Sequence, residues 1–216
     1  MLSLLLDAAW MTLGLALASL VGGMALALAF SAAELSKQRW LVWPVATLTT
    51  LIRGLPELLV VLFIYFGSTQ VLFLITGEYV EFSPFACGVL ALSLLFASYA
   101  TQTLRAALNA VPAGQRLAAL ALGLGKSHIF FHIVLPQAWR HALPGLGNQW
   151  LVLLKDTALV SLIGVNEMMR QAQMASASTY EPFTWYAAAA LIYLAISLVS
   201  EFGLKQAARY TRRYGG

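Results

Sequence analysis

Residues 8–33 read AAWMTLGLALASLVGGMALALAFSAA and carry no charge between Asp7 and Glu34. About 20 mostly apolar residues are enough for a helix to cross the hydrocarbon core of a membrane. This stretch therefore predicts a membrane-spanning helix. The composition agrees, since 60% of the 216 residues are hydrophobic and only 10% are charged, whereas a soluble domain has about 25% charged residues. A soluble enzyme and a disordered chain are both disfavoured.

Four further stretches have the length and the apolar character of membrane spans, at 46–66, 83–103, 145–165 and 183–203. We therefore expect an all-α membrane protein with five transmembrane helices in a single domain, residues 1–216. The second and fourth stretches are less apolar than the others, because each contains a basic and an acidic residue.

The basic residues between the expected spans predict the topology. Ten of them fall on one side and Arg170 falls on the other. Lys and Arg are retained on the cytoplasmic side of a membrane, so we expect the N-terminus outside and both the C-terminus and the loop 104–144 in the cytoplasm. We therefore attribute the net charge of +4 to the basic residues beside the membrane lipid. A nucleic acid partner is not expected. The ten residues are Lys37, Arg39, Arg105, Arg116, Lys126, Arg140, Lys205, Arg209, Arg212 and Arg213.

Four charged side chains remain within the expected spans: Arg53, Glu57, Lys155 and Asp156. Each costs about 2.5–3.5 kcal/mol at the centre of a span, so each needs a partner or water. Arg53 and Glu57 are four residues apart, so they share a helix face and could pair, whereas Lys155 and Asp156 point in different directions. Two interpretations stay open: a cluster of ion pairs that joins helices, or a polar site on a transport path. The carboxylates of Glu57 and Asp156 would suit a cationic substrate.

Residues 111–136 read VPAGQRLAALALGLGKSHIFFHIVLP. Residues 115–122 favour a short helix, which Gly123 is placed to end. A second short helix should follow and stop before Pro136. The apolar face of the first helix suits docking into the groove of a partner.

This loop resembles the cytoplasmic loop of ABC importer permeases, whose motif reads Glu-Ala-Ala, three residues, Gly, and after about nine residues Ile-x-Leu-Pro. Ala118, Ala119 and Gly123 match this motif, followed by the segment 133–136, and Leu117 replaces the motif's Glu.

Three further segments, 53–67, 99–105 and 143–161, resemble the second, third and fourth spans of the permeases of polar amino-acid importers. Together with the loop, they make the chain similar to the permease subunits of the histidine/arginine permease family. The resemblance implies the type I ABC importer permease fold and a location in the bacterial inner membrane. It also implies import of basic amino acids, most specifically arginine, by alternating access.

The resemblance also implies partners and site residues. A coupling helix around residues 115–124, with Leu117, Ala118, Ala119 and Gly123, would dock on a dimer of ATP-binding subunits. These partners would bind ATP and Mg²⁺, and this chain would hold no cofactor, no metal and no catalytic residue. A second permease subunit, either a sister or another copy, and an extracytoplasmic amino-acid-binding protein would complete the importer.

Acidic residues of the second and fourth spans hold the cationic side chain of the substrate in related permeases for basic amino acids. By position these are Glu57 and Asp156, with Asn148 and Gln149 as further polar contacts. Alternatives are the same class of importer for histidine, lysine or glutamine, and a structural or channel-forming membrane protein without an ATPase.

Overall fold

The computed structural model describes residues 2–36, 38–78 and 82–213. Lys37 and the side chains of Arg212 and Arg213, which the predicted topology counts, lie outside this description. Every regular element of the described residues is helical, as the composition predicts. The elements are α1 (Leu2–Glu34), α2 (Arg39–Gly54), α3 (Glu57–Thr76), α4 (Pro84–Ala110), α5 (Ala113–Ala121), α6 (Lys126–Ile129), the π-helical turn η1 (Phe130–Val134), α7 (Leu135–Asp156), the 3₁₀ segment η2 (Thr157–Ile163), α8 (Met168–Thr179) and α9 (Pro182–Arg213).

Four of the described helices are long and apolar enough to cross a membrane: α1, α3, α4 and α9. The predicted fourth span, 145–165, is not among them, because it comprises the polar end of α7 and the 3₁₀ segment η2. Helix α4 exceeds its predicted end at residue 103 by about two turns, since it continues to Ala110.

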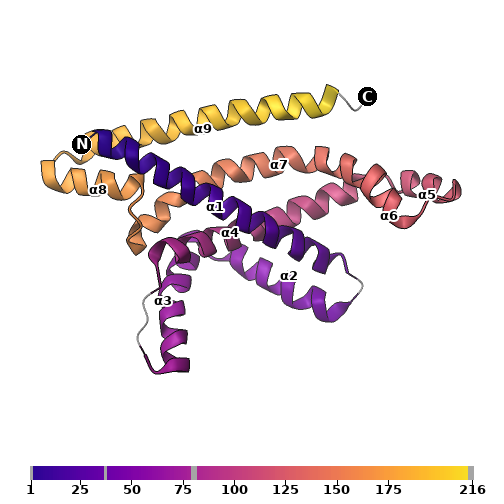
Figure 1. Ribbon diagram of the computed structural model, residues 1–216, viewed down its shortest axis with the longest axis horizontal. Helices are drawn as coiled ribbons and strands as arrows, with labels where there is room; N and C mark the ends of the chain where they lie inside the picture. The colour runs from indigo at the N-terminus through magenta and orange to yellow at the C-terminus, as the bar shows by residue number, and fades with distance from the viewer. Residues whose placement is uncertain (1, 37, 79–81, 214–216) are drawn as a thin grey trace.

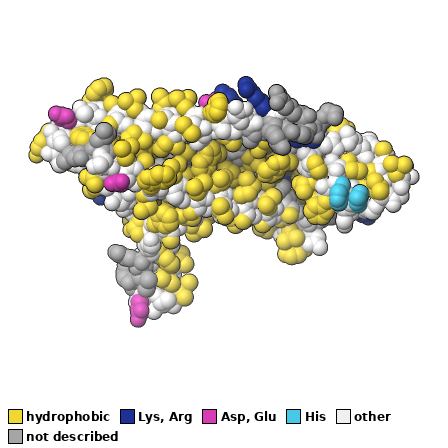
Figure 2. Space-filling view, turned by 45° about the horizontal axis from the view of Figure 1, so that its top comes forward, with side chains coloured by type: hydrophobic (Ala, Val, Ile, Leu, Met, Phe, Trp, Pro, Cys, Tyr) yellow, Lys and Arg dark blue, Asp and Glu magenta, His cyan; other side chains and the backbone are white. Residues whose placement is uncertain are grey.

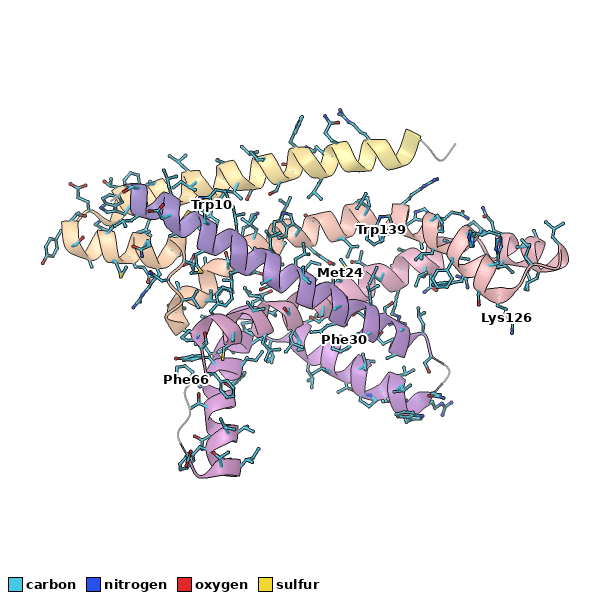
Figure 3. The ribbon with its side chains drawn as sticks, viewed as in Figure 1. Trp10, Met24, Phe30, Phe66, Lys126 and Trp139 are labelled. Atoms are coloured by element: carbon cyan, nitrogen blue, oxygen red, sulfur yellow. The ribbon has the colours of Figure 1, made fainter. Side chains whose placement is uncertain are left out.

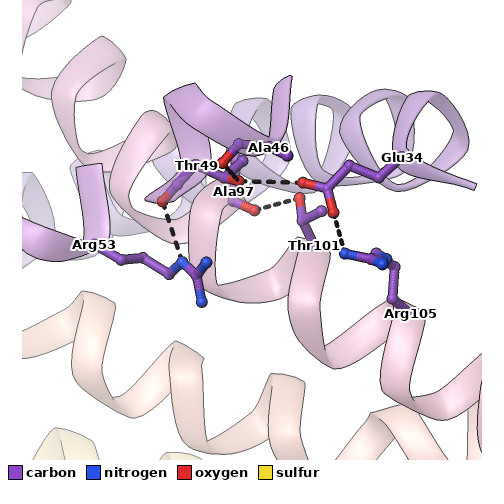
Figure 4. Close-up of polar contacts among 7 residues, drawn as sticks. All are labelled: Glu34, Ala46, Thr49, Arg53, Ala97, Thr101 and Arg105. Atoms are coloured by element: carbon purple, nitrogen blue, oxygen red, sulfur yellow. Dashed lines mark hydrogen bonds and ion pairs between the residues drawn. The ribbon is translucent and has the colours of Figure 1, made fainter. Parts of the chain in front are cut away.

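The predicted second span, 46–66, is divided into two helices by a break at Leu55 and Pro56. Leu55 has extended backbone angles (φ −99°, ψ 148°), which are the angles favoured before a proline. The expectation that Arg53 and Glu57 share a helix face and pair is therefore wrong. Arg53, in the last turn of α2, donates from Nε to the carbonyl oxygen of Thr49 at 3.1 Å (Figure 4). Glu57 begins the next helix, α3.

Helix α4 is the centre of the fold. It packs along α1 and α7 and also contacts α2 and α3, while α3 projects away from the other helices (Figure 1). The contact with α1 is close because α1 has glycine there: a Cβ on Gly23 would lie 3.0 Å from the carbonyl oxygen of Ser93. Ser93 Oγ also donates to the carbonyl oxygen of Ser19 at 3.1 Å. The helix that carries most of the buried core is thus fixed to α1 by both packing and hydrogen bonding.

The loop 111–136 forms α5, α6 and η1. Gly123 (φ +75°) follows α5, as predicted. The expected stop before Pro136 is wrong, because η1 leads directly into α7 and Leu135 keeps helical angles. A proline in the first turn of a helix needs no backbone N–H there, so Pro136 is accommodated without a break.

The elements divide between the two ends of the molecule. Helices α5 and α6, the α1–α2 turn and the end of α9 lie at one end, and the N-terminus and α8 lie at the other (Figure 1). Lys126 marks the first of these ends, and Trp139 lies on α7 nearer the middle (Figure 3). Figure 2 shows a broad apolar surface over the middle of the molecule and histidine side chains at the α5–α6 end. An apolar middle between more polar ends is the pattern expected of a membrane protein.

Candidate functional site

Tyr99 of α4 links two of the predicted site residues. Its hydroxyl donates to Oε1 of Glu57, the first residue of α3, at 3.5 Å. Tyr99 also lines a pocket of about 230 Å³ together with Asp156, the last residue of α7. The structure therefore brings Glu57 and Asp156 to the same region, from two helices that both contact α4.

The pocket beside Tyr99 lies between α4 and α7. Asn148 and Gln149 line it together with Asp156, while Glu57 adjoins it through Tyr99. All four substrate-binding residues predicted from the sequence thus fall around one cavity. The apolar part of its wall is formed by Leu95, Phe96, Val152 and Leu153.

The two carboxylates have no ion-pair partner among the residues that the structure describes, where the ion pairs are Arg105–Glu34 and Lys205–Glu201. Glu57 and Asp156 are also close enough to repel each other. Lys155 does not line this pocket: it lines a separate groove with Tyr186 and Tyr193 of α9. Lys155 also acts electrostatically on Asp156, but only the two carboxylates adjoin this pocket, and negative groups there favour a positive ligand.

The local sequence explains the placement of Glu57. Pro56 precedes α3 and fixes its start, so that Glu57 falls in the first turn of the helix. A carboxylate is favourable there, because the unpaired N–H groups of the first turn carry partial positive charge.

Gln149 makes a hydrogen bond that the sequence does not reveal. Its Nε2 donates to Thr103 Oγ1 at 2.7 Å, which joins α7 to α4. Its Oε1 is buried and has no partner among the described residues. Gly145 permits the two helices to approach here, because a Cβ at this position would lie 2.7 Å from Thr103 Cγ2.

A buried polar cluster at the α1–α2 end was also missed. Glu34, with a side chain only 1% exposed, forms an ion pair with Arg105 and accepts a hydrogen bond from Thr49 Oγ1 at 3.1 Å (Figure 4). By sequence both charged residues belong to predicted loops. Glu34 is the last residue of α1, and Arg105 lies in the part of α4 that continues beyond the predicted span, so the two helices bring them together.

The residues predicted for coupling lie on and just after α5. Leu117 and Leu120 are 65% and 48% exposed, and Ala118 is also exposed. Ala119 is buried in a small core with Val111, Val134 and Ala138 among its members. One face of α5 is therefore anchored to the protein, and its leucines remain free.

A larger cavity, of about 300 Å³, lies between α1, α4 and α7. Ser31 is the one polar residue among those that line it. A cavity of this kind cannot compensate a charged ligand, so the pocket beside Tyr99 remains the candidate site.

Comparison with known families decides the class of protein. The family described as "Binding-protein-dependent transport system inner membrane component" matches residues 25–213.

The chain belongs to this family.

Relatives of this inner membrane component extend over nearly its whole length. It is 58% identical to the arginine ABC transporter permease protein ArtQ of Haemophilus influenzae, over 98% of this chain and 95% of that protein. It is 54% identical to ArtQ of Escherichia coli, over 97% of each chain. The crystal structure of an amino acid ABC transporter with histidines has a similar chain, with a TM-score of 0.87 and 30% identity over 96% of this chain and 94% of that one.

Proposed function

We propose that this protein is the permease subunit of an ATP-driven ABC importer for basic amino acids, and specifically for arginine. The observation that carries the proposal is the pair of carboxylates, Glu57 and Asp156, beside one pocket between membrane helices without an ion-pair partner among the described residues. Ionisable groups within a membrane protein usually mark the path of a charged substrate. The two ArtQ relatives support arginine as that substrate.

In this proposal the chain is a single transmembrane domain with five spans. Helix α7 is the fifth, in addition to the four candidates, since it is long enough to cross and its polar face borders the pocket. The N-terminus is outside, and the C-terminus and α5 are in the cytoplasm of a bacterial inner membrane. The count of basic residues supports this orientation.

Partner proteins complete the importer. The exposed leucines of α5 dock on a pair of ATP-binding subunits, which hold ATP and Mg²⁺ and perform the hydrolysis. A second permease subunit, a sister chain or another copy, encloses the path. An extracytoplasmic binding protein delivers the amino acid.

Glu57 and Asp156 neutralise the cationic side chain of the substrate, while Asn148 and Gln149 supply polar contacts. When the ATP-binding subunits close, α5 transmits their movement to the membrane helices. The pocket then opens alternately to the outside and to the cytoplasm. An importer of the same class for histidine, lysine or glutamine remains the principal alternative.

The test uses two adjacent residues that face different surfaces. Asp156→Asn removes the charge at the pocket, whereas Lys155→Gln removes a charge in the separate groove. We expect Asp156→Asn to reduce uptake of radiolabelled arginine at least tenfold, because a hydrogen bond to a charged group contributes about 1.5–3 kcal/mol.

Lys155→Gln should change arginine uptake less than about threefold, because the side chain of Lys155 lies outside the pocket. Both variants should assemble at normal levels. Unchanged arginine uptake in Asp156→Asn would contradict the site, and glutamine uptake above arginine uptake in the wild type would favour the alternative importer.

A further inference from the structure

The groove that Lys155 lines shares no residue with the pocket beside Tyr99. It has a volume of about 360 Å³ and is formed by the end of α7, η2, α8 and α9. Of the described residues that line it, Lys155 is the one with a charge, and the others are three alanines, one methionine and two tyrosines. We call it the Lys155 groove.

The ammonium group of Lys155 lacks a counter-charge in this groove. Lys155 is exposed, and it forms no ion pair among the described residues. Asp156, the next residue, interacts with it electrostatically, but Asp156 lines the other pocket. A charged side chain at the end of a membrane helix needs a counter-charge or water. The groove therefore favours an occupant that brings an anion to Lys155.

The rest of the lining indicates what the anion is attached to. The hydroxyl of Tyr193 donates to Oε2 of Glu167 at 2.9 Å, so it cannot also donate to an anion in the groove. The hydroxyl of Tyr186 has no partner among the described residues and can donate. The alanines and the methionine offer only apolar surface, against which a free phosphate ion would lose its hydration. An anion that carries its own hydrocarbon chain fits this lining better.

The surface of α9 continues the groove with apolar side chains. Ala190 lines the groove, and Leu194 and Leu198 follow it at intervals of one helical turn on the same face. These leucines are 53% and 55% exposed on a candidate membrane span. Helix α3 projects on the opposite side of the molecule (Figure 1), so a second permease chain that covers α3 would leave this face of α9 to lipid.

We propose that the Lys155 groove binds an anionic phospholipid from the membrane leaflet at the α8 end of the molecule. The lipid phosphate lies at Lys155 and Tyr186, and an acyl chain follows Ala190, Leu194 and Leu198. Lysine is a common ligand of phosphate groups, and lysine and tyrosine side chains at the end of a span lie at the depth of the headgroups. This site is separate from the substrate pocket and does not depend on the identity of the substrate.

The test measures lipid binding to the complete transporter after its lipid has been removed in detergent. Native mass spectrometry gives the number of bound molecules at increasing concentrations of phosphatidylglycerol or phosphatidylcholine. Lys155→Gln should weaken phosphatidylglycerol binding at this site about fivefold or more, because one basic residue near an anionic lipid contributes about this factor. Binding of phosphatidylcholine, which has no net charge, should be the same in both proteins.

Three control variants separate charge from shape. Lys155→Arg keeps the charge and should bind phosphatidylglycerol like the wild type. Lys205→Gln removes a lysine of α9 that already pairs with Glu201, so it should not change lipid binding. Ala190→Phe fills the groove from an exposed position and should weaken phosphatidylglycerol binding without changing the yield of assembled transporter.

Three results would contradict the inference. Phosphatidylglycerol binding at wild-type strength in Lys155→Gln would exclude Lys155 as the ligand of the headgroup. Competition by millimolar glycerol 3-phosphate would show that the groove is a site for a free anion. Failure of two permease chains to assemble in Ala190→Phe would show that a second chain, and not lipid, covers the groove.

Discussion

At the scale of single residues, the charged side chains of this protein have two different roles. Glu34 and Arg105 neutralise each other within a buried cluster that joins α1, α2 and α4. Glu57 and Asp156 remain unpaired with cations among the described residues, beside a pocket. The first pair supports the fold, and the second is available to a ligand.

The Glu34–Arg105 ion pair should contribute measurably to stability. Removing one partner of a fully buried pair costs about 3–5 kcal/mol. Since the side chain of Arg105 is 34% exposed, water compensates part of the loss, and we expect Glu34→Gln to cost about 1–3 kcal/mol. Thermal unfolding in detergent measures this change.

The exposed Glu201–Lys205 pair on α9 provides the matched control. Its residues are 43% and 65% exposed and four positions apart, so Glu201→Gln should cost at most about 0.5 kcal/mol. Equal losses of stability in the two variants would show that the Glu34–Arg105 ion pair stabilises the fold no more than an exposed ion pair does.

At the scale of elements, the sequence predicts helices well and helix ends less well. The predicted spans 8–33, 83–103 and 183–203 each correspond to one long helix, because a long apolar run has no alternative to a helix in a membrane. The prediction of a single span at 46–66 is wrong because hydropathy carries no information about a break in the backbone. Leu55–Pro56 is the local signal that could have corrected it.

The candidate site was predictable in its residue types and not in its geometry. Glu57 and Asp156 are identifiable as charges within apolar sequence, and the structure places both near Tyr99. Tyr99 and Thr103 could not be found in this way, because an uncharged polar residue in a helix is ordinary until its partner across the helix contact is known. The Glu34–Arg105 contact joins residues 71 positions apart, and no local pattern predicts such a pairing.

Helix α5 offers a prediction about docking. Leu117 stands where the related loop motif has Glu, whereas Leu120 belongs to the apolar face of the same helix. Leu117→Glu should therefore retain the ATP-binding subunit, and Leu120→Glu should lose most of it, because it places a charge in an apolar contact. Co-purification of the ATP-binding subunit with each variant is the measurement.

Both leucines are exposed, at 65% and 48%, so neither substitution removes a fully buried contact within this chain. Full co-purification with Leu120→Glu would show that the partner binds elsewhere.

At the scale of the whole molecule, much of the exposed surface is apolar. Phe63 and Phe66 on α3 are 63% and 62% exposed, and Val199 and Phe202 on α9 are 74% and 66% exposed. Figure 2 shows many hydrophobic side chains over the middle of one face. Lipid covers part of such a surface, and a second permease subunit is expected to cover another part.

We therefore expect the complete transporter to contain two permease chains and two ATP-binding subunits. Native mass spectrometry of the purified assembly gives this ratio directly. Co-expression of two differently tagged copies of this chain then shows whether the second permease is the same chain: both tags purify together if it is. An assembly with a single permease chain would contradict the expectation.

The break between α2 and α3 has a mechanical consequence. Leu55 and Pro56 separate the two helices, so a rotation of α3 about this break would have Glu57, its first residue, immediately beside the axis. Helix α3 is about 30 Å long, so a swing of about 10° at this break moves its far end by about 5 Å. Glu57 itself is displaced by less than about 1 Å in the same swing. Such a rotation of α3 would therefore change the surface at its far end while the carboxylate of Glu57 keeps its position beside the pocket.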